Sequence, residues 1–387
     1  MTHNSPAVGS GDAAGTAMFP ATVQSATGPP ARPGPAAGVL MLAPSGGLGG
    51  GIERYLEALE RAFAALGASY QRVNLSRPGA PAHARLLVTA RSALRASPQP
   101  ARLIVGHRAL LPVAVLLARE CAVHSISVLC HGSDAWDARL RPRRLLERHL
   151  MHRRAVRVVA VSSFTAGAVA CGRHATVLPP ALPPEWFDTL AQAERAAPGK
   201  APGKAQGTRL VTVFRLADWR DKGLPQLIQA VIALGRPGIH LTVCGSGTPP
   251  PGLLALLREH PWCELRAGLP DRELAREFAG ADLFVLATRT RSGWHASGEG
   301  FGMVLLEAQV AGTPVIAPAY GGSRDAYIDG VTGVAPVDES VEALTEALRY
   351  LLADPARLAW MGNRAAEWAR EAFDPGRYPD LVARRLL

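Results

Sequence analysis

Residues 38–66, GVLMLAPSGGLGGGIERYLEALERAFAAL, contain the pattern that decides the fold class. An apolar run of strand length comes first and is followed by a glycine-rich segment. The stretch that follows places Ile52, Leu56, Leu59 and Phe63 at helical spacing. Strand, glycine-rich turn and helix in this order predict the first unit of a parallel α/β sheet.

The same alternation recurs on both sides of a Gly/Pro/Ala/Lys segment. Strand-like runs include RLIVGH, SISVLCHG and RVVAVSS before it, and RLVTVFRL, HLTVCGSG and ADLFVLATRT after it. Helices are expected between these runs, such as LPQLIQAVIAL and DRELAREFAG in the second half. The segment itself, residues 194–207, predicts a flexible linker. Residues 1–38 have almost no charge and no periodicity, and we expect a disordered tail. The predicted domains are therefore 39–193 and 208–372. A C-terminal helix is predicted at 373–387, and a return of this helix to the first domain is one possibility.

The composition is that of a globular enzyme-sized protein. The chain has 387 residues, of which 48% are hydrophobic and 19% charged. Its five cysteines include no C-x-x-C pair, so we expect neither a disulfide framework nor a cysteine zinc site. No basic segment followed by an apolar one marks a secretory signal near Met1, and the apolar run at 109–118 is too short for a membrane span. These features predict a cytoplasmic protein.

The positive charge is concentrated in one segment. The formal net charge is +10, which favours anionic partners. Residues 139–157 contain eight arginines and a single acid, Glu147, with leucines between them. Two interpretations fit: a basic amphipathic helix at an anionic membrane surface, or an ordinary solvated helix face. Nucleic-acid binding is not expected, because no stacking aromatic residues accompany the arginines.

The glycine-rich segment excludes a dinucleotide-binding dehydrogenase. The third glycine of that fingerprint would fall on Ile52, and no acid for the ribose occurs between Glu60 and Glu120. Gly50 and Gly51 nevertheless stand at the start of a predicted helix. Either their N–H groups bind an anion, or the glycines only allow a tight turn. The chain contains no D-x-D pair for a metal, so a diphosphate leaving group would need cationic side chains instead.

The second half supplies such cations and two spaced carboxylates. Arg215 follows a predicted strand and Lys222 precedes a predicted helix, so together they could clamp phosphate oxygens. The segment GEGFGMVLLE places Glu299 in a glycine-rich loop and Glu307 in the helix after it. Backbone N–H groups at 300–302 could hold phosphate or sugar, and the carboxylates could accept hydrogen bonds from vicinal hydroxyls. The alternative is a pair of surface charges.

At this point the residues resemble glycosyltransferase family 4, the retaining enzymes of the GT-B fold. The resemblance covers nearly all of residues 208–370 and has the family's motifs in order. These are FRL with KG, VCGSG, RAGLPDRELAREFAGADLFVLAT, GEGFGMVLLEAQVAGTPVIA and GGSRDAYIDGVTG. In the first half the similarity is looser and rests on GGLGGGIERYLEAL, LCHGSDAW and VAVSSFTAG followed by VLPPAL. It implies two Rossmann-like domains that face a cleft.

The resemblance also implies roles for the matching residues. Arg215 and Lys222 would bind the donor diphosphate, with Gly50 and Gly51 as further candidates. Glu307 would hold the ribose of the nucleotide. Glu299 would contact hydroxyls of the donor sugar. The residues lining the sugar beside it would be Gly300, Phe301 and Gly302.

One histidine and two departures from the family pattern complete the expected site. His131 matches a histidine that lies beside the reacting carbon in relatives, and its role here is either catalytic or structural. Phe214 stands where the family usually has a strand-end glycine, which would narrow the diphosphate pocket. Trp219, in the turn that follows, could instead supply an indole wall.

The resemblance implies a retaining hexosyltransferase that uses a nucleoside-diphosphate sugar as substrate and needs no metal or other cofactor. GDP-mannose is the favoured donor and UDP-glucose the next. A glycan or polyprenyl-linked acceptor in exopolysaccharide or lipopolysaccharide assembly is expected, with peripheral attachment to the membrane through the 139–157 segment as one possibility. The alternatives are a catalytically silent nucleotide-sugar binder and a GT-B phosphorylase, and no motif for the pyridoxal phosphate lysine of such a phosphorylase is present.

Overall fold

The computed structural model describes residues 38–44, 51–75, 79–97, 100–132, 142–169, 175–193, 207–291 and 296–387. All of them belong to one compact unit, residues 37–387. The predicted tail lies outside the described residues except for Gly38, as does the predicted linker except for Gly207. The expectation that both segments are flexible therefore stays a prediction.

The first half of the chain forms a six-stranded parallel sheet in the order β2-β1-β3-β4-β5-β6. Its strands are β1 (Val39–Ala43), β2 (Tyr70–Asn74), β3 (Ala101–Val105), β4 (Val123–Cys130), β5 (Val156–Ala160) and β6 (Thr176–Val177). The helices of this half are α1 (Gly51–Ala65), α2 (Ala80–Ala96), η1 (Arg108–Leu110), α3 (Leu111–Glu120), α4 (Pro142–Met151), α5 (Ser163–Val169) and α6 (Pro184–Ala191).

The second half repeats this architecture in the order β12-β11-β10-β7-β8-β9, again with parallel pairing. Its strands are β7 (Thr208–Val213), β8 (Ile239–Gly245), β9 (Cys263–Ala267), β10 (Leu283–Val285), β11 (Val315–Ile316) and β12 (Gly333–Val334). The helices are η2 (Leu216–Asp218), α7 (Leu224–Leu234), α8 (Pro251–Arg258), α9 (Asp271–Gly280), α10 (Met303–Val310), η4 (Gly322–Ala326), α11 (Val341–Leu352), α12 (Pro355–Ala372) and α13 (Tyr378–Arg385). The predicted α/β class with two Rossmann-like sheets is confirmed.

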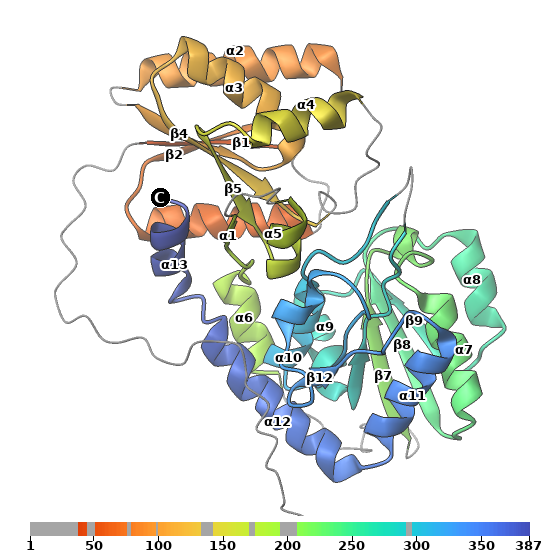
Figure 1. Cartoon of the computed structure of the whole chain (residues 1–387). Helices are drawn as coiled ribbons and strands as arrows, with labels where there is room; N and C mark the ends of the chain where they lie inside the picture. The colour runs from red at the N-terminus through yellow and green to blue at the C-terminus, as the bar shows by residue number, and fades with distance from the viewer. Residues whose placement is uncertain are drawn as a thin grey trace, which may run out of the picture. The chain divides into compact units, whose positions relative to one another are not determined.

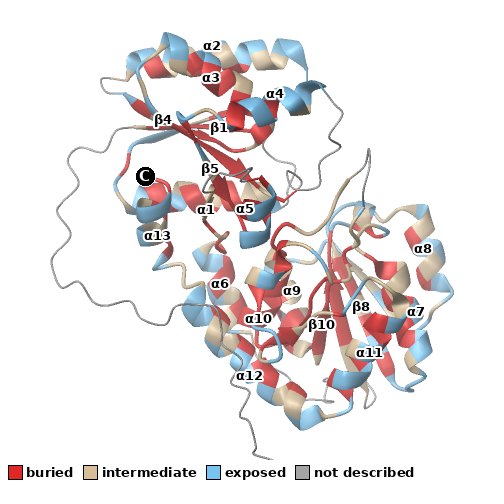
Figure 2. Cartoon of the chain, in the orientation of Figure 1, coloured by how far each residue is buried: buried red, intermediate tan, exposed pale blue. Residues whose placement is uncertain are grey.

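Helices cover both faces of the first sheet, with α2, α3 and α4 on one side and α1, α5 and α13 on the other (Figure 1). Every residue of β1 is buried, as a sheet covered on both faces requires (Figure 2). Met41 packs with the α1 side chains, whereas Leu40 and Leu42 pack with those of α2 and α3. Of the predicted helix positions, Leu56, Leu59 and Phe63 are buried, and Ile52 is only partly so.

One hydrophobic core joins the two halves. It contains Leu59 and Phe63 of α1 and also Leu305 of α10 and Phe278 of α9. The last helix contributes Val382, because α13 packs against α1. A hydrogen bond from Arg157 Nη2 to the carbonyl oxygen of Arg385, at 3.1 Å, ties the same helix to β5.

The basic segment is only partly helical, which corrects the prediction of one amphipathic helix. The helix α4 spans Pro142–Met151, and Arg157 already lies in β5. Glu147 is not on a solvated face either: it is 1% exposed and pairs with Arg108, Arg143 and Arg144. Within the described part of the chain, no helix is both long enough and apolar enough to cross a membrane.

Candidate active site

A cavity of about 600 Å³ brings the predicted site residues together at the carboxyl ends of the strands. It lies where β4 and β7 end and where α1, α7 and α10 begin. The predicted residues among its lining are Gly51, His131, Arg215, Lys222, Glu299, Gly300, Phe301, Gly302 and Glu307. Gly50 lies outside the described residues.

Glu299 is held in a fixed orientation by two side chains. Its Oε2 accepts a hydrogen bond from Lys222 Nζ at 2.8 Å and another from Thr288 Oγ1 at 3.0 Å. Thr288 is buried just beyond the end of β10, so its hydroxyl is a fixed donor. Since both donors use one oxygen, Oε1 is the atom left to meet a substrate hydroxyl.

Arg215 is the more exposed of the two predicted cations. It lies two residues beyond the end of β7, and its Nε pairs with Asp218 Oδ2 at 3.2 Å. Its side chain is 58% exposed, so the pair contributes little and leaves the guanidinium available to a phosphate. The prediction that Trp219 could form a wall of this pocket is wrong. The indole is 5% exposed, packs in the core of the second sheet and lies under the guanidinium of Arg220 at 4.0 Å.

Glu307 is buried in α10 at 1% exposure. Its Oε1 accepts hydrogen bonds from Arg54 Nη1 at 2.6 Å and from Trp186 Nε1 at 3.1 Å. The attraction to Arg54 offsets the cost of burying the carboxylate. Its other oxygen, Oε2, has no hydrogen-bond partner among the residues that the structure describes.

His131 lies directly after β4, and its ring is fixed by three neighbours. Nε2 lies 2.7 Å from the carbonyl oxygen of Gly106, which can only accept, so Nε2 carries the proton. The ring meets Tyr55 edge-on at 5.6 Å and stacks parallel to His107 at 6.5 Å. In the neutral ring, Nδ1 is then the basic atom.

The glycine loop approaches His131 so closely that a side chain would not fit. A Cβ on Gly300 would lie 2.1 Å from the carbonyl oxygen of His131, and one on Gly322 would lie 1.9 Å from that of Gly300. Glycine at these two positions therefore lets the loop that carries Glu299 approach the end of β4. This contact places His131 and Glu299 on the same cavity.

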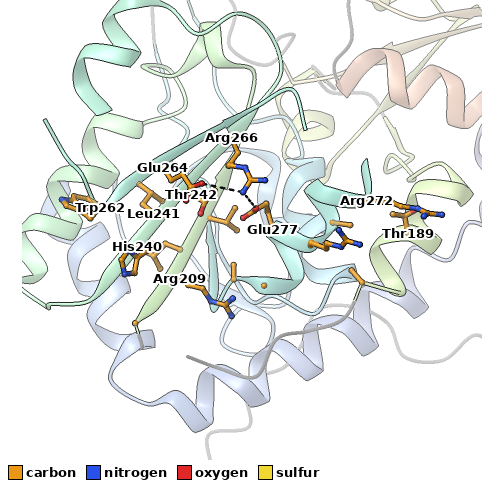
Figure 3. A pocket seen from close by; sticks show the side chains of 18 of the residues that line it. Thr189, Arg209, His240, Leu241, Thr242, Trp262, Glu264, Arg266, Arg272 and Glu277 are labelled. Carbon is orange, nitrogen blue, oxygen red and sulfur yellow. Dashed lines mark ion pairs between the residues drawn. The ribbon is translucent and has the colours of Figure 1, made fainter. Parts of the chain in front are cut away.

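A larger cavity of about 980 Å³ lies elsewhere, along β7, β8, β9 and α9 (Figure 3). Its carboxylates, Glu264 and Glu277, both pair with Arg266, at 3.7 and 3.1 Å. Among its other lining residues, His240 is the second residue of β8 and Pro261 precedes β9, so this cavity reaches the starts of these strands. The smaller cavity lies at the carboxyl ends of the strands, where open α/β sheets bind their ligands. The smaller cavity is therefore the better candidate for binding a sugar and a diphosphate together.

Two parallel six-stranded sheets with a pocket at their strand ends are the architecture of the GT-B fold. The profile of the family described as "Glycosyl transferases group 1" matches residues 200–368. The chain belongs to this family and is a glycosyltransferase. It is 34% identical over 277 residues to the GDP-mannose-dependent alpha-(1-6)-phosphatidylinositol monomannoside mannosyltransferase of Mycolicibacterium smegmatis, across 67% of this chain and 70% of the relative.

Solved structures show the same fold at lower identity. Sucrose-phosphate synthase from Thermosynechococcus elongatus aligns with a TM-score of 0.71 and 17% identity, over 89% of this chain and 98% of that one. HepE of Anabaena, crystallised with UDP-glucose, aligns with a TM-score of 0.67 and 18% identity, over 90% and 99%.

Three residues that hold the predicted glutamates were not predicted from the sequence. Arg54, Trp186 and Thr288 each bond to one of the two predicted glutamates. Arg54 comes three residues after Gly51 within GGIER, so its place in the first turn of α1 could have marked it. Trp186 sits in an ordinary amphipathic helix, and nothing in its local sequence distinguishes it from a core residue.

Proposed function

We propose that the protein transfers a hexose from a nucleoside-diphosphate sugar to a lipid-linked or glycan acceptor with retention of configuration. GDP-mannose is the favoured donor and UDP-glucose the next. The observation that carries the proposal is the convergence of Arg215, Lys222, Glu299 and Glu307 on one cavity. The relative from Mycolicibacterium smegmatis, named as GDP-mannose-dependent with a phosphatidylinositol mannoside as acceptor, supports this donor and favours a glycolipid acceptor.

In this proposal the two cations stabilise the departing diphosphate. Arg215 offers a planar fork of donors and Lys222 a point charge, and together they balance the negative charge that develops as the glycosidic bond breaks. Glu299 holds sugar hydroxyls through Oε1. The acceptor attacks on the face that the phosphate leaves, and the phosphate takes the acceptor's proton. His131 lines the same cavity with Nε2 held by Gly106, and in this proposal its ring orients the sugar.

The decisive experiment compares donors and then removes the clamp. Purified protein is screened with GDP-mannose, UDP-glucose and the bare diphosphates by thermal shift, because a bound ligand raises the unfolding temperature by mass action. Turnover is then measured with the best donor. Replacing both Arg215 and Lys222 by Ala should cost about 2 to 4 kcal/mol of transition-state stabilisation. A double variant within threefold of the wild type would exclude the clamp, and the absence of any donor shift would exclude the function.

A further inference from the structure

A single side chain lies between Glu299 and the helix that follows it. The residues before α10 are Gly300, Phe301 and Gly302, and the two glycines have no side chain to pack. Gly302 also has φ of +83°, a conformation that favours glycine. Phe301 borders the cavity but is only 4% exposed, because it belongs to the core that joins the two halves. Its side chain can therefore anchor the Glu299 loop, residues 299–302.

The ring of Phe301 packs against an aromatic residue near the end of the chain. It meets the ring of Phe373 edge-on, with 6.0 Å between the two centroids. Phe373 also meets Trp368 edge-on, at 5.5 Å, so it has two aromatic partners. Aromatic pairs of this kind favour one relative orientation of the rings. The three rings thus connect the Glu299 loop to α12, which packs beside α10 (Figure 1).

The backbone of Phe373 is fixed as well. Phe373 caps the C-terminal end of α12, and its N–H donates a hydrogen bond to the carbonyl oxygen of Ala369 at 3.1 Å. The helix α13 follows and packs on α1 in the first half. Tyr55 of α1 meets the ring of His131 edge-on. The turn between α12 and α13 therefore connects the side of the cavity that carries Glu299 to the side that carries His131.

We infer that Phe373 is a positioning residue that holds Glu299 beside the donor sugar through the ring of Phe301. This inference rests on the proposed function, in which Glu299 contacts sugar hydroxyls. Among the described residues that line the cavity, Phe373 is absent, so it acts without touching the donor. The N–H of Gly322 also holds the loop, since it donates to the carbonyl oxygen of Glu299 at 2.8 Å. Loss of the Phe373 ring should therefore displace the loop rather than unfold it, and a small displacement of a catalytic group lowers the rate strongly.

The test replaces Phe373 by leucine, which keeps an apolar side chain but removes the ring. We expect kcat with the full donor to fall about tenfold. The dissociation constant of the bare nucleoside diphosphate, measured by calorimetry, should not change, because that ligand has no sugar. Phe373 also borders a separate cavity of about 370 Å³, so Phe373→Tyr can keep the ring and should restore most of the rate. Trp360→Leu, at a half-exposed tryptophan of α12, is the control for the loss of an aromatic side chain and should keep the wild-type kcat.

A double-mutant cycle tests whether Phe373 acts through the loop. Phe301→Leu removes the other ring of the pair, so the losses in kcat from the two single variants should not add in the double variant. Unfolding temperatures are measured for all variants, because a residue that only stabilises the fold would lower them and leave kcat unchanged. Phe373→Met, which keeps more of the volume of the ring, takes the place of Phe373→Leu if the leucine variant does not fold.

Three results would overturn the inference and leave the proposed function intact. These are a wild-type kcat in Phe373→Leu, additive losses in the double variant, and a loss of nucleotide affinity as large as the loss in kcat. A wild type that transfers no sugar from any donor would overturn both.

Discussion

Glu299 and Glu307 lie eight positions apart in the chain and occupy very different environments. The Glu299 side chain is 14% exposed, and its Oε2 accepts hydrogen bonds from Lys222 and Thr288. Glu307 is almost completely buried and bonded from the other half of the chain. Their shared spacing predicted one site for both. The structure adds a reason to expect that their replacement has different effects.

Glu299→Gln should lower kcat by about ten- to a thousandfold, because its contact strengthens as positive charge develops on the sugar ring. Its binding of the bare nucleoside diphosphate should hardly change, since that ligand has no sugar. Glu307→Gln should raise the donor KM with kcat nearly kept, because the ribose does not react. It should also weaken binding of the bare diphosphate.

Steady-state kinetics with the full donor and calorimetry with the nucleoside diphosphate together separate the two effects. Loss of nucleotide affinity in Glu299→Gln but not in Glu307→Gln would show that the two roles are reversed. Two variants with wild-type kinetics would show that neither carboxylate belongs to the site.

Sequence spacing could predict these carboxylates but not the residues that hold them. Trp186 and Glu307 are 121 positions apart, and Arg54 and Glu307 are 253 apart. Such pairs form only after both sheets are folded and packed. Local periodicity therefore identifies Trp186 as a buried aromatic residue and says nothing of its N–H donor.

Among the elements, the helices of the second half match their predicted bounds most closely. The segments LPQLIQAVIAL and DRELAREFAG are α7 and α9. Each has an amphipathic pattern and a local start or stop signal. The basic segment was predicted less well, because its helix begins only at Pro142 and buries its single acid, Glu147, through a tertiary contact with Arg108.

The helix α4 also offers the clearest test of membrane contact. Leu145 and Leu146 are 56% and 49% exposed, and Arg148 is exposed beside them. Arg148→Gln should weaken binding to anionic vesicles about fivefold, the equivalent of about 1 kcal/mol for one charge near such a surface. Adding Leu145→Gln should weaken it further, with turnover on a short soluble acceptor unchanged. Vesicle cosedimentation at low salt measures the effect.

Arg143 and Arg144 are poor choices for this test because both stabilise buried Glu147. Leu254→Gln with Arg258→Gln, on α8, is the matched control, since it removes an exposed leucine and an exposed arginine elsewhere. If the wild type does not bind anionic vesicles, or if the control variant weakens binding equally, the exposed side of α4 is only a solvated surface.

The glycine that precedes α7 leads to a prediction about stability. Gly223 has φ of +72°, and a Cβ there would lie 1.9 Å from the carbonyl oxygen of Ala287. Gly223→Ala should destabilise the protein by about 2 kcal/mol or more and displace the adjacent Lys222. Gly235, at the other end of α7, has φ of +64°, but a Cβ there would meet no atom within 4 Å. Gly235→Ala should therefore lower the free energy of unfolding by only about 1 kcal/mol. Urea unfolding compares the two, and equal losses would exclude the steric argument.

Over the whole molecule, the positive charge does not accumulate in the candidate site. The formal charge of the chain is +10, yet the ionised side chains that line the cavity are mostly acidic. They comprise Arg54, Arg215 and Lys222 against Glu53, Glu57, Asp218, Asp271, Glu299 and Glu307. Net charge therefore could not have located the site. Donor binding must rest on individual contacts, such as those of Arg215 and Lys222.

The same contacts lead us to expect that transfer needs no divalent metal. Turnover should persist in excess EDTA, because Arg215 and Lys222 take the part that a metal would play at the diphosphate. The assay follows release of the nucleoside diphosphate before and after chelation, with a manganese-dependent transferase as a positive control for metal removal. Complete loss of turnover that manganese restores would contradict the expectation.

The packing of α13 on α1 means that the two sheets are not independent modules for protein engineering. The chain passes from the first half to the second, and its last helix packs against a helix of the first half. A fragment that ends before residue 194 would lack α13 and would expose apolar surface of α1 to water. Grafting the donor-binding half onto another acceptor-binding half would meet the same obstacle. A functional chimera therefore needs two junctions, one in the segment before β7 and one between α12 and α13, so that the final helix remains with its partner.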